Sequence, residues 1–155
     1  MNLTVAGECA DHFEREYKDK LEKFIIENNL TEKVNLLENV AHEDMDKLYA
    51  KADLFVLPST REPASISQLE AMAFSVPAIC SDKNGTSCYI KEGYNGFCFK
   101  YNSREELRQV IVKCISNPVN LRKMGENSFK EIEEACKFDI YFEKIMQCME
   151  KDDHR

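Results

Sequence analysis

The pattern of apolar and polar positions along the chain predicts short strands that alternate with amphipathic helices. Apolar runs bounded by Gly, Pro or Asn are typical of buried strands, and apolar positions three and four residues apart are typical of helices. Strands are expected at residues 3–7, 34–37, 53–57, 77–80 and 96–99. Helices are expected at residues 11–28, 44–50, 65–74, 103–116 and 139–150, with one more that begins at Asn117-Pro118.

The order of these elements is that of an α/β fold. Strands that alternate with helices favour βα units, and βα units favour a mainly parallel sheet. The segment 53–57 is almost wholly apolar, as is expected of a strand that helices cover on both faces. A length of 155 residues suits one domain, so we expect a single domain over residues 1–155. Such sheets bind ligands at the carboxyl ends of their strands, where the segment after Leu57 lies.

Composition and charge disfavour several classes of function. The net charge is −7, from 21 basic and 28 acidic side chains, and no stripe of Lys and Arg offers a surface for nucleic acid. The seven cysteines include no CxxC pair, so neither a zinc ribbon nor a thioredoxin-type site is expected, and a reducing cytosol is favoured. No apolar run approaches the roughly 20 residues that span a bilayer. Early acidic residues argue against a signal peptide.

One stretch, STREPASISQLEAMA, contains two glutamates in the spacing E-x7-E. Ile66, Leu69 and Ala73 are expected to form the apolar stripe of the helix at 65–74. Glu70 follows Ile66 by one helical turn, so it would lie on that stripe. A carboxylate there needs a partner, because an unpaired buried charge costs several kcal/mol.

The segment between the two glutamates favours a bound anion. Glu62 lies in the loop before the helix, and the first N–H groups of a helix have no partner within it. The residues concerned are Ala64, Ser65 and Ile66. A nucleotide sugar has the matching layout, with hydroxyl groups at two places and phosphates between them. In the alternative, Glu62 only favours the helix dipole and Glu70 pairs with Arg61 or Lys83, and spacing alone does not decide between the two.

Three stretches follow one another as they do in a known enzyme family. VNLLENVAHEDMDKLYAKAD has a strand, a turn and a short helix, and ADLFVLPSTREPASISQLEAMAFSVPAICSD has a strand, Pro-Ser, the E-x7-E helix and a further strand. KNGTSCYIKEGYNGFCF has a glycine turn and a G-x-N-G strand. This order resembles the C-terminal, nucleotide-sugar-binding half of the family 4 retaining glycosyltransferases of the GT-B type. The resemblance covers nearly the whole chain and implies a Rossmann-like parallel sheet with helices on both faces.

The resemblance implies a role for each candidate residue. Glu62 resembles the glutamate that contacts hydroxyl groups of the donor sugar, which makes it the candidate catalytic residue, and Glu70 resembles the glutamate that holds the ribose. Asn39 and Val40 match the turn that touches the base. The residues whose backbone amides would face the diphosphate and sugar are Ala64, Ser65 and Ile66. Catalysis would rest on orientation of the donor and on N–H dipoles that stabilise the leaving nucleoside diphosphate.

The resemblance also implies the substrates. A sugar would pass from a nucleotide sugar of the UDP or GDP type to a glycan or glycolipid acceptor, and neither a metal nor another cofactor would be needed. Ser65 stands where the family usually has glycine, and Cys88 stands where many members have an acidic residue. Both departures concern the identity of the donor and leave the donor class unchanged.

The sequence lacks a part that the resembled half normally has. That half opens with one more strand and helix, and the strand lies mid-sheet with an arginine and a lysine for the diphosphate in its loop. We therefore expect a fragment with a five-stranded parallel sheet that lacks its central strand. The acceptor would bind through a missing N-terminal domain, which would also bring a cytoplasmic enzyme to the inner membrane face. This chain alone is expected to be inactive.

Other interpretations compete with this one. A degenerate, non-catalytic interaction module is the main alternative, and nucleotide binding would separate the two. A flavodoxin-like signalling domain would need a phosphorylatable aspartate at a strand end, and Asp82 has that placement. Asp44-x-Asp46 matches the D-x-D signature of metal-dependent glycosyltransferases, but the helix dipole already favours acidic residues in a first turn, which disfavours a metal. No G-x-G-x-x-G follows the first strand, so a dinucleotide oxidoreductase is disfavoured.

Overall fold

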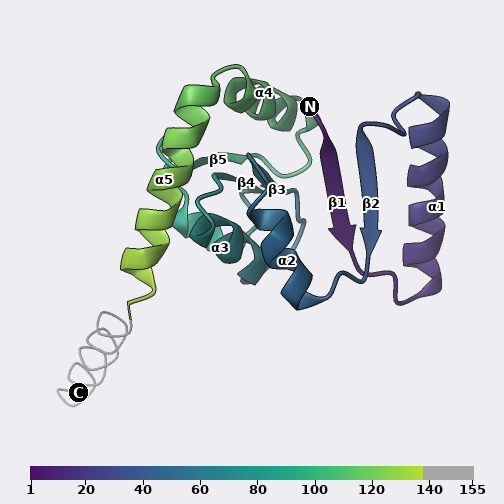
Figure 1. Ribbon diagram of the computed structural model, residues 1–155, viewed down its shortest axis with the longest axis horizontal. Coiled ribbons are helices and arrows are strands. Elements are labelled where there is room, and N and C mark those ends of the chain that lie inside the picture. The colour runs from purple at the N-terminus through teal and green to yellow at the C-terminus, as the bar shows by residue number, and fades with distance from the viewer. Residues whose placement is uncertain (138–155) are drawn as a thin grey trace, which may run out of the picture. The chain divides into compact units, whose positions relative to one another are not determined.

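The computed structural model describes residues 1–137, and strands and helices alternate through most of this range (Figure 1). The helix predicted at 139–150 lies outside the described residues. The elements are β1 (Leu3–Gly7), α1 (His12–Glu27), β2 (Val34–Glu38), α2 (His42–Tyr49), β3 (Phe55–Leu57), α3 (Ile66–Ala73), β4 (Ala78–Ser81), the 3₁₀ helix η1 (Gly85–Tyr89), β5 (Gly96–Phe99), α4 (Arg104–Ile115) and α5 (Pro118–Ala135).

All strand pairs within residues 1–137 are parallel, which confirms the α/β fold class. The five strands form two sheets, of order β1-β2 and β3-β4-β5, in place of the expected single five-stranded sheet that lacks its central strand. The sheets are separate because, among residues 1–137, β1 pairs only with β2 and β3 pairs only with β4.

The chain divides into two compact units, and the first is Met1–Lys47. In it, α1 begins with a capping box: the Glu14 N–H donates to Asp11 Oδ1 at 2.8 Å, and the Asp11 N–H donates to Glu14 Oε2 at 3.2 Å. Lys18 of α1 pairs with Glu38 at the end of β2. Ile25 is the one buried residue among residues 1–47, so this unit has a small apolar core.

The second unit begins at Leu48 and contains the three-stranded sheet, with helices over both faces (Figure 1). Successive residues of a strand point to opposite faces. Accordingly, Ile79 of β4 packs with Cys114 of α4 and Met124 of α5, whereas Ala78 packs with Met72 of α3. All four residues of β4 are buried. Each large side chain buried in this way contributes about 2 kcal/mol of hydrophobic free energy to folding.

The buried face of α3 differs from the predicted stripe. Gln68, Ala71 and Met72 are buried, whereas Ile66 is 69% exposed and Ala73 is exposed. The pattern misled because a glutamine occupies a core position, where hydrogen bonds satisfy its amide. Glu70 therefore does not lie on the buried face of α3, and its side chain is half-buried.

Candidate functional site

The loop between β3 and α3 is fixed at the carboxyl end of the three-stranded sheet by main-chain bonds. The Glu62 N–H donates to the Lys83 carbonyl at 3.4 Å, and the Gly85 N–H donates to the Glu62 carbonyl at 2.7 Å. These bonds form a short parallel bridge between Glu62 and Asn84. Glu62 thus has a defined backbone position in a loop that would otherwise be free, and its side chain is half-buried.

Gly85 makes this close approach possible. A Cβ atom at Gly85 would lie 1.9 Å from the Pro63 carbonyl oxygen, a distance that no real Cβ contact shows. A second bond holds the beginning of the loop, since the Ser81 hydroxyl donates to the Ser59 carbonyl at 2.6 Å. The loop and the turn after β4 therefore form one packed structure.

A buried polar cluster of Gln68, Asn84 and Thr86 anchors α3 to the same turn. Gln68 Nε2 donates to the Thr86 carbonyl at 3.0 Å, and Asn84 Nδ2 donates to Gln68 Oε1 at 2.6 Å. The Thr86 hydroxyl lies 2.8 Å from Asn84 Oδ1 and 3.1 Å from Gln68 Oε1. Fully satisfied networks of this kind hold a single arrangement, because each group left unpaired would carry a desolvation cost.

The N-terminus of α3 follows directly on the loop that carries Glu62. Ser65 caps the helix, since its Oγ accepts a hydrogen bond from the Gln68 N–H at 3.2 Å. Within residues 1–137, no hydrogen bond uses the N–H of Ala64, Ser65 or Ile66. Free N–H groups and the helix dipole together favour an anion at this place.

Glu70 lies in the second turn of α3 and is held by a tyrosine. The Tyr49 hydroxyl donates to Glu70 Oε2 at 3.0 Å. The proposed alternative partners are excluded, because neither Arg61 nor Lys83 forms an ion pair within the described part of the chain. The interpretation that Glu70 is neutralised by one of these two cations is therefore wrong.

Asn39 and Val40 belong to the first unit, where they line a cavity of about 390 Å³. The other lining residues are Ala6, Gly7, Glu8 and Met45. Asn39 has a φ of 48°, its N–H donates to the Gly7 carbonyl at 3.0 Å, and its Oδ1 accepts from the Cys9 N–H at 3.2 Å. The turn after β2 is thereby tied to the turn after β1, and the cavity lies at the carboxyl ends of both strands.

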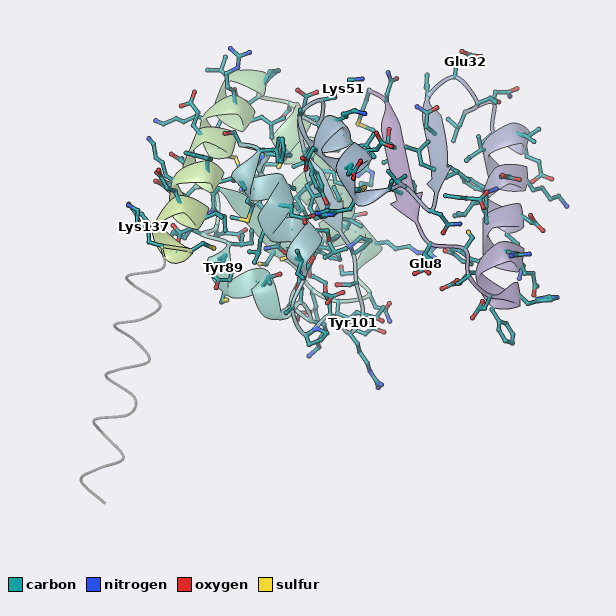
Figure 2. All side chains as sticks on the ribbon, turned by 60° about the horizontal axis from the view of Figure 1, so that its bottom comes forward. Glu8, Glu32, Lys51, Tyr89, Tyr101 and Lys137 are labelled. Atoms are coloured by element: carbon teal, nitrogen blue, oxygen red, sulfur yellow. The ribbon has the colours of Figure 1, made fainter. Side chains whose placement is uncertain are left out.

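Figure 2 shows this end of the first unit at Glu8, with Glu32 at the opposite end of the same two strands. The second unit brings together the other candidates, Glu62, Ala64, Ser65, Ile66 and Glu70, on one loop and the start of one helix.

Sequence reasoning missed Tyr49, Gln68 in its buried role, and the cluster of Asn84 with Thr86. Tyr49 is 21 residues from Glu70 and lies on another helix, so no local spacing links the two. The sequence marks Asn84 as a turn residue, but it does not show that the Asn84 side chain binds Gln68 of α3.

The other candidate chemistries find less support. Among residues 1–137, no group of three or more His, Cys, Asp or Glu side chains is arranged to hold a metal ion. The carboxylate of Asp44 pairs with Lys47 at 2.6 Å. Asp82 Oδ1 accepts a hydrogen bond from the Tyr101 N–H at 2.8 Å, which is a structural use of that carboxylate. No helix within the same residues is both long and apolar enough to cross a membrane.

Comparison with known proteins decides the family. The model of the family described as glycosyl transferases group 1 matches residues 1–131. The chain belongs to this family. An uncharacterised glycosyltransferase of Methanocaldococcus jannaschii is 30% identical to this group 1 chain over 108 residues, which is 70% of the chain and 30% of the relative. The Escherichia coli enzyme UDP-Gal:alpha-D-GlcNAc-diphosphoundecaprenol alpha-1,3-galactosyltransferase is 26% identical over 131 residues, or 80% of this chain and 34% of that enzyme.

Solved structures agree on the fold of this group 1 chain. Anabaena HepE in complex with UDP has a TM-score of 0.81 at 22% identity, over 97% of this chain and 41% of that one. Sucrose-phosphate synthase from Thermosynechococcus elongatus has a TM-score of 0.79 at 22% identity, over 97% and 38%. The α/β fold is thus that of GT-B glycosyltransferase structures. The chain spans about a third of the length of the curated relatives it matches.

Proposed function

We propose that the chain is the donor-binding part of a retaining, family 4 glycosyltransferase and corresponds to the C-terminal half of a GT-B enzyme. The observation that carries this proposal is the layout of one continuous segment. Glu62, the unused N–H groups at the start of α3, and Glu70 follow one another at the carboxyl end of the sheet. Two carboxylates with an anion site between them suit a sugar, a diphosphate and a ribose in that order.

Each part of the donor has a proposed contact. Glu62 accepts hydrogen bonds from hydroxyl groups of the donor sugar, and Glu70 accepts them from the ribose. The backbone amides of Ala64, Ser65 and Ile66 bind the diphosphate. These N–H dipoles are already oriented in the free protein, so they stabilise the negative charge that develops on the leaving nucleoside diphosphate without reorganisation. The transfer proposed here uses no metal.

Asn39 and Val40 are proposed to contact the base of a donor of the UDP or GDP type. The cavity of about 390 Å³ that they line supports this role. The printed names of similar proteins include a UDP-Gal transferase and a complex with UDP, which favours uridine among the bases to be tried first.

The departure at Ser65 is compatible with donor binding. A side chain at this position would obstruct a ligand if it projected over the helix start. Ser65 is instead 4% exposed, and its Oγ turns back to cap the helix and lies 3.1 Å from Ser67 Oγ. The Ser65 side chain therefore does not project over the helix start, where Ala64 and Ile66 are exposed, and this observation supports donor binding over a non-catalytic interaction module.

The acceptor side is proposed to lie in a further domain. The chain spans about a third of its curated relatives, so a glycan or glycolipid acceptor would be bound by the remainder of such an enzyme. We propose that the complete enzyme is cytoplasmic and reaches the inner face of the membrane through that remainder. Turnover by these 155 residues alone is not expected.

The test is a titration of the purified chain with UDP, GDP and ADP, followed by amide NMR. Binding of one nucleotide should shift the amides of Ala64 to Ile66. Glu70→Ala should weaken nucleotide binding, so that the same shift requires a higher nucleotide concentration, because the ribose contact is lost. Glu126→Ala, which removes an exposed glutamate of α5, serves as the matched control and should bind like the unaltered chain. A folded chain whose amides respond to none of the three nucleotides would contradict donor binding and favour the non-catalytic module.

A further inference from the structure

Tyr49 links the end of α2 to the candidate ribose-binding glutamate. It is 4% exposed, and its hydroxyl donates to Glu70 Oε2 at 3.0 Å. A buried phenol needs a polar partner for its hydroxyl group, and a hydrogen bond to a carboxylate is stronger than one between neutral groups. The contact therefore ties Glu70 to a point outside its own helix.

The position of this hydroxyl is set by packing of the tyrosine ring. The ring centroid of Tyr49 lies 6.3 Å from that of Phe55 in β3, in an edge-to-face arrangement. It lies 5.8 Å from that of Phe74, which caps the end of α3. Aromatic neighbours on two sides leave the ring little freedom, so the hydroxyl is a fixed donor.

A glutamate side chain has three rotatable bonds, and holding it in one rotamer costs conformational entropy. Glu70 is half-buried and lies beyond the buried face of α3, so packing alone does not fix its carboxylate. A donor that is already fixed selects one rotamer before the ligand arrives. Preorganisation of this kind increases affinity because the ordering cost is met during folding.

We propose that Tyr49 is a positioning residue for the nucleotide, and that its hydroxyl holds the Glu70 carboxylate in the orientation that receives the ribose hydroxyl groups. This inference rests on the proposed function of Glu70. It adds a residue of α2 to the part of the proposed site that the β3–α3 loop and α3 form.

The experiment compares Tyr49→Phe with the unaltered 155-residue chain. The variant removes one oxygen and keeps the ring against Phe55 and Phe74. Dissociation constants are measured for UDP and for its 2′,3′-dideoxy counterpart, or for GDP and its counterpart if guanosine is the base that binds. The unaltered chain should prefer the ribonucleotide, and Tyr49→Phe should reduce that preference about tenfold by weakening the ribonucleotide alone.

Two further variants separate positioning from a structural role. In a Glu70→Ala background, Tyr49→Phe should have no additional effect on nucleotide affinity, because the group that it positions is absent. Tyr17→Phe, an exposed tyrosine of α1, should leave both affinities unchanged. A merely structural role of Tyr49 would instead weaken both nucleotides equally and would persist in the Glu70→Ala background.

The outcomes also separate this inference from the function on which it rests. If the unaltered chain binds ribose and dideoxyribose nucleotides equally well, or binds neither, Glu70 does not hold a ribose and both proposals are overturned. If the unaltered chain prefers the ribonucleotide and Tyr49→Phe keeps the full preference, the role of Tyr49 is overturned and that of Glu70 stands.

Discussion

Glu62 and Glu70 are held by contacts of different kinds. The main chain of Glu62 bonds to Lys83 and Gly85, whereas the side chain of Glu70 bonds to Tyr49. Substitution of Glu62 therefore leaves the path of its loop intact, and substitution of Tyr49 changes the freedom of the carboxylate at Glu70. At the scale of residues, the position of one glutamate depends on backbone geometry and that of the other depends on a distant side chain.

Gln68 is the residue whose loss should most disturb the base of the site. Gln68→Ala leaves polar groups of Asn84 and Thr86 buried without a partner, so we expect the free energy of unfolding to fall by about 3 kcal/mol. Urea denaturation measures this change. Gln109→Ala, which removes an exposed glutamine of α4, is the control and should change stability by less than about 0.5 kcal/mol. Equal effects of the two variants would contradict the prediction.

Two cysteines on neighbouring strands should differ in reactivity. Cys80 and Cys98 have sulfur atoms 3.8 Å apart. The hydrogen bond between them, reinforced by burial, raises the pKa of the Cys80 thiol, and the same bond lowers the pKa of Cys98. As pH rises, Cys98 should form its thiolate first and react with iodoacetamide before Cys80.

The check is peptide mass spectrometry of alkylated protein across a pH series. Cys80→Ala removes the donor, so alkylation of Cys98 should move to higher pH. If Cys80 is alkylated before Cys98 in the unaltered chain, the shared proton lies on Cys98 and the prediction is contradicted.

The sequence predicted the two glutamates of the candidate site but not the tyrosine that binds one of them. The E-x7-E spacing was visible because Glu62 and Glu70 are near in sequence. The partner of Glu70 was not, because Tyr49 approaches it only through the packing of separate elements. Local spacing shows which side chains lie close together on one helix or loop. Contacts between separate elements depend on the tertiary fold.

At the scale of elements, α5 makes a close backbone approach to the turn between α3 and β4, at Gly125. A Cβ atom there would lie 2.1 Å from the Ser75 carbonyl oxygen, in the turn between α3 and β4. Ser75 itself has a φ of 60°, so this turn has little room to adjust. The crossing of α5 over this turn thus requires a residue without a side chain.

Gly125→Ala should therefore destabilise the protein, although alanine is the better helix former by about 1 kcal/mol. The steric clash outweighs that gain, and we expect a net loss of about 2 kcal/mol or more in the free energy of unfolding. Gly7→Ala is the matched control, because nothing lies within 4 Å of the added Cβ atom. Thermal unfolding followed by circular dichroism compares the two, and a Gly125→Ala protein as stable as the control would refute the crossing geometry.

Periodicity predicted the order of strands and helices well, and it failed on the orientation of α3. The expected face contained Ile66, which is 69% exposed, and omitted Gln68, which is fully buried. Apolar periodicity cannot place a buried polar residue, since its burial depends on hydrogen-bond partners in another element. Those partners, Asn84 and Thr86, lie in a turn whose position the sequence did not specify.

For the molecule as a whole, the division into two sheets and two compact units should appear in its dynamics. Among residues 1–47, Ile25 alone is buried, whereas every residue of β4 is buried. Local opening is easiest where few apolar side chains are removed from water. Peptides from β1 and β2 should exchange amide hydrogens at least about tenfold faster than peptides from β4.

Hydrogen exchange followed by mass spectrometry tests this expectation. The mass of the intact protein, measured at the start and end of the time course, is the reference for total exchange. Uniform exchange rates across both sheets would indicate one cooperative unit. The sequence predicted five parallel strands but not their separation, because an apolar run shows that a strand is buried and does not show which strand it pairs with.

The backbone bridge between Glu62 and Asn84 has a consequence for how such proteins diversify. The bonds at Lys83 and Gly85 involve only main-chain atoms of the loop, so they survive when the side chains at Glu62, Ala64 or Ile66 change. Side chains exposed on a frame of this kind can be exchanged one at a time without loss of folding. Under the proposed function, single substitutions on this frame would change the sugar that is bound while the loop keeps its path, and Gly85 stays constrained by the neighbouring Pro63 carbonyl.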